Sequence, residues 1–81
     1  MIEEVAFGRI DERLACHLLE RGRGRDEIKI THQDLAVELG TAQKVVSWQL
    51  KEFERHGWVS LARGRIHFEK VSALEALAKN T

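Results

Sequence analysis

Apolar and polar positions follow two different spacings along this 81-residue chain, and each spacing predicts one type of element. Apolar residues recur every three or four positions over residues 8–21, which predicts a first helix. Two glycines within residues 21–25 predict a loop after it. Apolar residues at every second position over residues 27–30 then predict a short strand.

The next segment, residues 31–57, has the pattern of two short helices joined by a tight turn. Ala36, Gly40 and Val46 are spaced four and then six residues apart. A helix-turn-helix needs a small residue where two crossed helices touch, and a glycine for the left-handed turn residue. It also needs a branched apolar residue that packs the second helix onto the first. We expect further core contacts from Leu35, Leu39, Leu50 and Phe53, with Val45 beside this core side.

Polar residues and glycines mark the ends of both helices. Thr31 is a good N-cap for the first helix of the helix-turn-helix, which we expect to end at about Leu39. Thr41 is expected to cap the second helix, predicted over residues 42–56 and ended by Gly57.

The rest of the chain predicts a hairpin and a last helix. Residues 58–62 and 65–69 alternate around Arg63 and Gly64, a β-hairpin pattern, and residues 72–78 predict a short helix. The fold class is therefore mainly α with a small β-hairpin wing: a winged helix-turn-helix with a three-helix core. We expect one domain over residues 1–81, with 1–7 as a linker remnant, 31–57 as the helix-turn-helix and 58–69 as the wing.

Composition places the chain among ordinary globular proteins, with 43% apolar and 32% charged residues. It lacks an apolar run that could span a membrane and a basic N-terminus typical of a signal peptide, so we expect a cytoplasmic protein. The net charge is zero, but residues 21–70 hold ten Lys and Arg against seven Asp and Glu, whereas residues 1–20 hold two against five. We therefore expect weak nucleic-acid binding by the isolated domain.

The side of the second helix opposite its core residues is the candidate base-contacting face. Glutamine pairs with adenine, and lysine donates to guanine, whereas a small serine lets the helix approach the groove. An ordinary solvated face is the alternative, but a position after a helix-turn-helix turn and before a wing favours groove contact. The candidates for base contacts are Gln43, Lys44, Ser47 and Trp48.

Trp48 has three interpretations, because a tryptophan on a solvent face is costly unless something covers it. It packs back onto the wing as peripheral core, it contacts a thymine methyl group, or it anchors a protein partner. The third gives the alternative function, a winged helix for protein–protein interaction that does not bind DNA. Salt dependence separates the two functions, since DNA binding weakens steeply with salt.

Candidates for DNA-backbone contacts lie at the start of the first helix of the helix-turn-helix, on its second helix and at the wing. The N–H groups at a helix N-terminus suit a phosphate, and long basic side chains reach the backbone. The alternatives to backbone contact are that Thr31 only caps its helix and that the wing arginines lie in a solvated turn. Arg21, Arg23 and Arg25 are assigned to a solvated loop. The candidates are Thr31, His32, Gln33, Lys51, Arg63 and Arg65.

Residues 30–78 resemble the C-terminal DNA-binding domain of the Crp/Fnr superfamily of bacterial transcription regulators. The matching motifs are Ile30-Thr31-x-x-Asp-Leu-Ala36, Leu39-Gly40-Thr41, Val45-Val46-Ser47-x-x-Leu50, Gly57-Trp-Val-x-Leu and the Arg-Gly-Arg wing. Upstream, Asp11-Glu-Arg-Leu-Ala15 and Leu18-Leu19 are similar to the helix that opens this domain.

The resemblance implies a larger protein than this chain. Family members have an N-terminal effector domain and a dimerisation helix, bind near-palindromic DNA as homodimers and contact RNA polymerase. By this resemblance the chain is an excised, monomeric C-terminal domain without a cofactor of its own. The resemblance does not identify the effector of the N-terminal domain. Backbone contacts through Thr31, Gln33, Thr41 and Ser47 are implied. The family commonly has arginine, glutamate and arginine where this chain has Gln43, Lys44 and Trp48, so the family's usual operator is not implied.

An enzyme is not expected. The four histidines, His17, His32, His56 and His67, lack metal-ligand spacing. The single cysteine, Cys16, excludes an internal disulfide and a multi-cysteine zinc site, and its position among leucines predicts a partly buried structural thiol.

Overall fold

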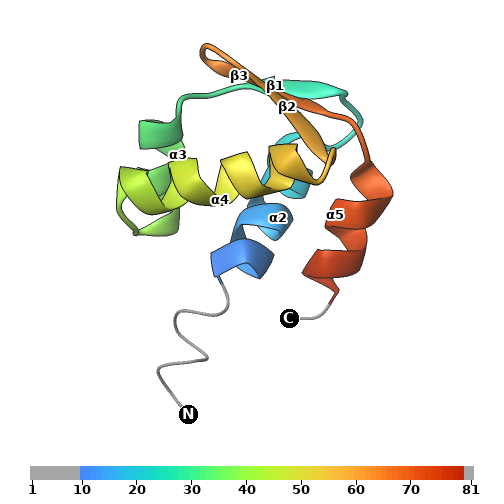
Figure 1. Cartoon of the computed structure of the whole chain (residues 1–81), viewed down its shortest axis with the longest axis horizontal. Helices are drawn as coiled ribbons and strands as arrows, with labels where there is room; N and C mark the ends of the chain where they lie inside the picture. Colours follow the sequence, from blue (N-terminus) through green and yellow to red (C-terminus); the bar gives the residue numbers. More distant parts are fainter. Residues whose placement is uncertain (1–9, 80–81) are drawn as a thin grey trace.

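The structure, a computed structural model, describes residues 10–79 (Figure 1). Four helices and a small sheet follow one another in the predicted order. The predicted linker at 1–7 and the first two residues of the predicted first helix lie outside the described residues. The elements are α2 (Ile10–Arg21), β1 (Glu27–Lys29), α3 (His32–Leu39), α4 (Gln43–Arg55), β2 (Val59–Ala62), β3 (Arg65–Phe68) and α5 (Val71–Ala78).

One apolar core joins all of these elements. Figure 1 shows the sheet along one side of the helices, with α5 beside α2. Every described helix and strand contributes at least one buried side chain, and the core residues expected from α3 and α4 are confirmed. The buried apolar residues are Leu14, Ala15, Leu18, Ile28, Ile30, Leu35, Ala36, Leu39, Val46, Leu50, Phe53, Val59, Ile66, Phe68 and Leu74.

The turn between α3 and α4 has the predicted geometry. The Thr31 hydroxyl oxygen accepts a hydrogen bond from the Asp34 N–H at 3.0 Å, which caps α3. Gly40 has φ +71°, in the left-handed region. Its N–H donates to the Val37 carbonyl at 3.2 Å, and the Thr41 N–H donates to the Ala36 carbonyl at 2.9 Å. These two bonds form a Schellman motif, which satisfies the last carbonyls of α3.

The prediction that Thr41 caps α4 is wrong. The N-cap is Ala42, and it makes no side-chain capping bond. Thr41 lies one residue too early, because its N–H already completes the C-terminal motif of α3. Helix α4 is also one residue shorter at each end than predicted. As predicted, the residue that ends it is Gly57, at φ +79°.

The predicted hairpin is part of a three-stranded antiparallel sheet with the order β1-β3-β2. Ile66 on β3 is paired with Ile28 on β1 and with Leu61 on β2. Ile30, predicted as the last residue of the first strand, lies just beyond β1, and its N–H donates to the Gly64 carbonyl at 3.0 Å. This bond ties the wing tip to the residue before the α3 cap, so the wing and the helix-turn-helix are held side by side.

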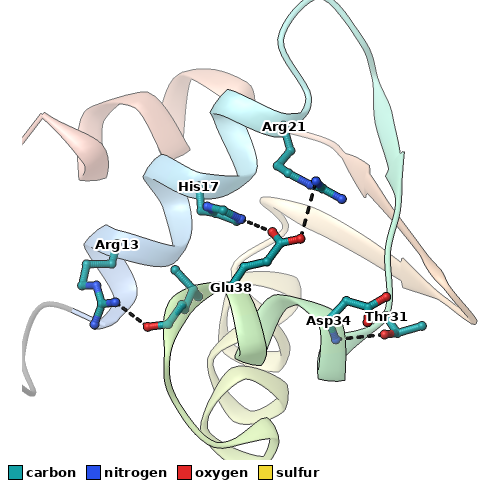
Figure 2. A network of polar contacts seen from close by, with 7 residues as sticks. Arg13, His17, Arg21, Thr31, Asp34 and Glu38 are labelled. Carbon is teal, nitrogen blue, oxygen red and sulfur yellow. Dashed lines mark hydrogen bonds and ion pairs between the residues drawn. The ribbon is translucent and has the colours of Figure 1, made fainter.

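A polar network holds α2 against α3 (Figure 2). The Glu38 carboxylate lies between His17 and Arg21, with the Arg21 guanidinium at 3.5 Å. The Arg13 guanidinium donates to the Leu39 carbonyl at the end of α3. Carbonyls in the last turn of a helix lack intrahelical partners, so Arg13 satisfies an acceptor that α3 leaves open.

Two expectations about buried side chains are wrong. Cys16 is exposed, because Leu14, Ala15 and Leu18 occupy the inward side of α2 and position 16 falls outside it. Trp48 is 59% exposed and does not pack back onto the wing. Two interpretations of Trp48 therefore remain: contact with a thymine methyl group and contact with a protein partner.

Candidate nucleic-acid interface

The outward face of α4 consists of Lys44, Trp48, Lys51 and Arg55, which are spaced four, three and four residues apart. This spacing places them in one row on the helix surface, and all four are exposed. Arg55 hydrogen-bonds to the Glu52 carboxylate at 2.8 Å. The bond lowers the pKa of Glu52 and raises that of Arg55, so both stay charged near neutral pH. The row therefore presents three cations around one indole.

An open groove of about 630 Å³ lies beside this face, between the start of α3, the middle of α4 and the wing tip. Three segments far apart in the sequence meet there. Six residues predicted to contact DNA line the groove, together with Glu54 and an apolar wing edge. The lining residues are Thr31, His32, Gln33, Gln43, Lys51, Glu54, Leu61, Ala62, Arg63 and Gly64.

Hydrogen bonds fix the walls of this groove relative to one another. His32 Nδ1 lies 2.9 Å from the Ser47 hydroxyl, which joins the first turn of α3 to α4. The Leu61 N–H donates to the Glu54 carboxylate at 3.4 Å, which joins the wing to α4. The start of α3, α4 and the wing are thus positioned together before any ligand binds.

The two wing arginines lie in different surroundings. Arg63 is exposed at the turn and lines the groove. Arg65 lies on β3 opposite Lys29, and its guanidinium is 3.8 Å from the Glu27 carboxylate on β1. The groove therefore includes Arg63 and leaves Arg65 on the sheet.

Comparison with protein families identifies this architecture. The model of the Crp-like helix-turn-helix domain matches residues 12–77. The chain belongs to this family. It is thus a helix-turn-helix domain of the kind that binds DNA in transcription regulation, as the sequence predicted.

Individual relatives agree with this assignment. The transcriptional regulator SdrP of Thermus thermophilus is 29% identical over 98% of this chain and 43% of its own length. A putative Crp/Fnr regulator from Eubacterium rectale has 36% identity and a TM-score of 0.85, over 96% of this chain and 37% of its own. The catabolite activator protein of Thermus thermophilus has 27% identity and a TM-score of 0.84, over 98% and 38%. The chain thus spans about two fifths of these relatives.

The groove of this Crp-like domain unites most, but not all, of the predicted contact residues. Lys44 and Trp48 lie on the neighbouring outward face, and Ser47 is bonded to His32. Thr41 is half-buried in the turn and does not line the groove. Sequence reasoning missed Glu54, although its place seven residues after Ser47 puts it on the same side of α4.

Within residues 10–79, no group of three or more His, Cys, Asp or Glu side chains is placed to hold a metal ion. No described helix is long and apolar enough to cross a membrane.

Proposed function

We propose that α4 enters the major groove of double-stranded DNA. The groove on the protein surface, between α3, α4 and the wing tip, then receives the phosphate backbone of the DNA. The observation that supports this most is the meeting of three distant segments in one groove. They contribute the α3 N-terminus, the Lys51 ammonium and the Arg63 guanidinium. Backbone N–H groups at a helix N-terminus favour an anion, and the two cations add charge-assisted contacts.

Base contacts are assigned to Lys44 and Trp48 on the outward face of α4 and to Gln43 and Ser47 beside that face. Gln43 offers a bidentate pair to adenine, and Lys44 donates to guanine N7 and O6. Ser47 is held by His32, so it sets the position of α4 against α3 as well as letting the helix approach the bases. Trp48 completes the face of α4 that is proposed to enter the major groove of DNA.

The whole protein is proposed to resemble its relatives in its organisation. This chain covers about two fifths of transcription regulators that match it, so an effector domain and a dimerisation element are assigned to the remaining part. We infer a homodimer that contacts RNA polymerase in the bacterial cytoplasm, with the DNA-binding part itself monomeric. This part is proposed to bind DNA without a cofactor and without catalysing a reaction.

An NMR titration tests the proposed interface. The isotope-labelled 81-residue chain is mixed with a short mixed-sequence duplex at low salt, and the backbone amide signals are followed. We expect shifts at residues 31–33, 41–51 and 63–65 that added salt reverses, because counterions compete for the phosphates. A folded chain whose signals do not move there would refute the proposal. Shifts on α4 with a protein ligand, insensitive to salt, would favour the protein-interaction alternative.

Two lysine variants provide a matched comparison. Lys51→Ala removes a cation from the groove, whereas Lys79→Ala removes one beyond the end of α5. Lys51→Ala should weaken binding to every duplex and reduce the slope of log K against log salt by about 1. Lys79→Ala should leave both the affinity and the slope unchanged. Equal losses in the two variants would show that the binding follows overall charge.

A further inference from the structure

Helix α4 exposes two apolar side chains that are close in sequence, one of them a tryptophan. Trp48 is 59% exposed and Val45 is 37% exposed. They are three residues apart, and side chains at this spacing are neighbours on a helix surface. Burial here does not follow residue type, since the polar Gln49, one residue after Trp48, is only 8% exposed. The pair forms an exposed patch, which we name the Trp48–Val45 patch.

Charge around the patch restricts what covers it. Lys44 and Lys51 lie four residues before and three residues after Trp48, and Arg55 follows seven residues after it. An occupant must therefore combine an apolar contact at the centre with negative charge at the edges. Arg55 is already paired with Glu52, but an uncharged apolar protein surface would leave Lys44 and Lys51 unpaired on binding, whereas a DNA duplex supplies phosphates on both sides of its major groove.

The two acidic side chains of α4 are engaged within the protein. A carboxylate accepts a hydrogen bond from the amino group of cytosine. Glu52 is bound to Arg55, and Glu54 is bound to the Leu61 N–H, so both carboxylates already have partners. A cytosine would therefore have to share these carboxylates with Arg55 and the Leu61 N–H, whereas an apolar group at Trp48 needs no such partner.

We infer that the Trp48–Val45 patch contacts the C5-methyl group of thymine in the major groove. This methyl group is the apolar feature that distinguishes thymine there from the other three DNA bases. The inference rests on the proposed function, because it requires α4 to lie in the major groove. It assigns to Trp48 and Val45 a specificity contact, and it predicts a thymine in each DNA half-site at the position opposite Trp48.

Replacing thymine by uracil tests this contact directly, since uracil keeps every hydrogen-bonding group and lacks only the methyl. The 81-residue chain first selects duplexes from a random pool. Each thymine of a selected duplex is then replaced by deoxyuridine, one position at a time, and Kd is measured by fluorescence anisotropy. We expect one position in the site bound by this monomeric chain where Kd rises about threefold to fivefold, the effect of one buried methyl group.

Two variants show whether Trp48 is responsible. Trp48→Ala should bind the thymine and uracil duplexes equally at the sensitive position. Val37→Ala, which shortens a 73% exposed apolar side chain on α3 outside the groove lining, should retain the difference. Both positions are on the surface, so each variant should fold, and circular dichroism melting tests this. Retention of the uracil effect in Trp48→Ala would overturn the assignment.

The other outcomes are separable. Equal binding of every uracil duplex by the unchanged chain would overturn the methyl contact and leave DNA binding in place. Failure to enrich or bind any duplex, in a folded chain at low salt, would overturn the proposed function and with it this inference. A third duplex has 5-methylcytosine paired with guanine at the sensitive position. Tighter binding of this duplex than of thymine would assign the contact to a methylated cytosine and overturn the thymine assignment.

Discussion

Gly22, just after the end of α2, is predicted to be intolerant of even one added methyl group. A Cβ atom at this position would lie 2.1 Å from Phe68 Cε2 and 2.6 Å from Phe68 Cζ. Carbon atoms in favourable contact are about 3.5–4.0 Å apart, so the ring would have to move by more than about 1 Å. Phe68 is 7% exposed and belongs to the core, so its ring cannot move without disturbing its neighbours.

The cost of Gly22→Ala follows from this geometry. Overpacking a well-packed core by one methyl group costs about 1–3 kcal/mol. For a domain of this size, Tm falls by about 4–8 °C for each kcal/mol, so a loss of about 2 kcal/mol lowers Tm by about 8–16 °C. Thermal unfolding followed by circular dichroism measures the change, and urea unfolding measures the free energy directly.

A double-mutant cycle separates the steric clash from other effects of the substitution. Phe68→Leu removes the ring atoms that the new Cβ would meet, so Gly22→Ala should cost much less in that background. We expect a coupling energy of at least about 1 kcal/mol, as for residues in direct contact. Additive losses, or an unchanged Tm in the single variant, would refute the steric argument.

Two further substitutions test the turn and the recognition helix. Gly40→Val places a β-branched side chain at φ +71° and should destabilise the domain by at least about 1–2 kcal/mol, so an unchanged Tm would exclude Gly40 as an essential turn residue. Lys44→Ala should change the bases preferred at one position of selected duplexes. An equal loss of affinity for all duplexes would show that Lys44 contacts only phosphate.

The helix-turn-helix could be predicted from the sequence because local rules determine it. A left-handed turn residue favours glycine, and a threonine before a helix offers a capping oxygen, so Gly40 and Thr31 have the predicted roles. The cap of α4 did not follow the same rule. Thr41 is the correct residue type, but the motif that ends α3 uses its N–H, and the next helix starts one residue later.

Burial along α4 could not be predicted as well, because it depends on how the helix is rotated against its neighbours. The apolar character of Val45 predicts a position beside the core, yet Val45 is 37% exposed, whereas the polar Gln49 is 8% exposed. Cys16 differs for the same reason on α2. Residue type indicates which side chains tend to be buried, whereas packing of the whole domain decides borderline positions.

The candidate groove depends on tertiary contacts that no local pattern contains. The pairing of β1 with β3 and the bond from the Ile30 N–H to the Gly64 carbonyl place the wing tip beside the start of α3. Sequence reasoning predicted a hairpin and a helix N-terminus as separate features. Their meeting with α4 explains why Arg63 lines the groove and Arg65, only two residues later, pairs with Glu27.

The zero net charge of the chain is compatible with DNA binding, because affinity depends on the phosphates that are neutralised locally. Glu38 is held between His17 and Arg21 on the α2 side of α3 (Figure 2). Within residues 10–79, the cations Lys44, Lys51 and Arg63 form no ion pair. If the two of these that line the groove, Lys51 and Arg63, contact phosphates as proposed, the salt slope is about −2 on logarithmic axes, whatever the total charge. The arrangement of paired and unpaired charges, which the fold determines, therefore has more influence on DNA binding than their sum.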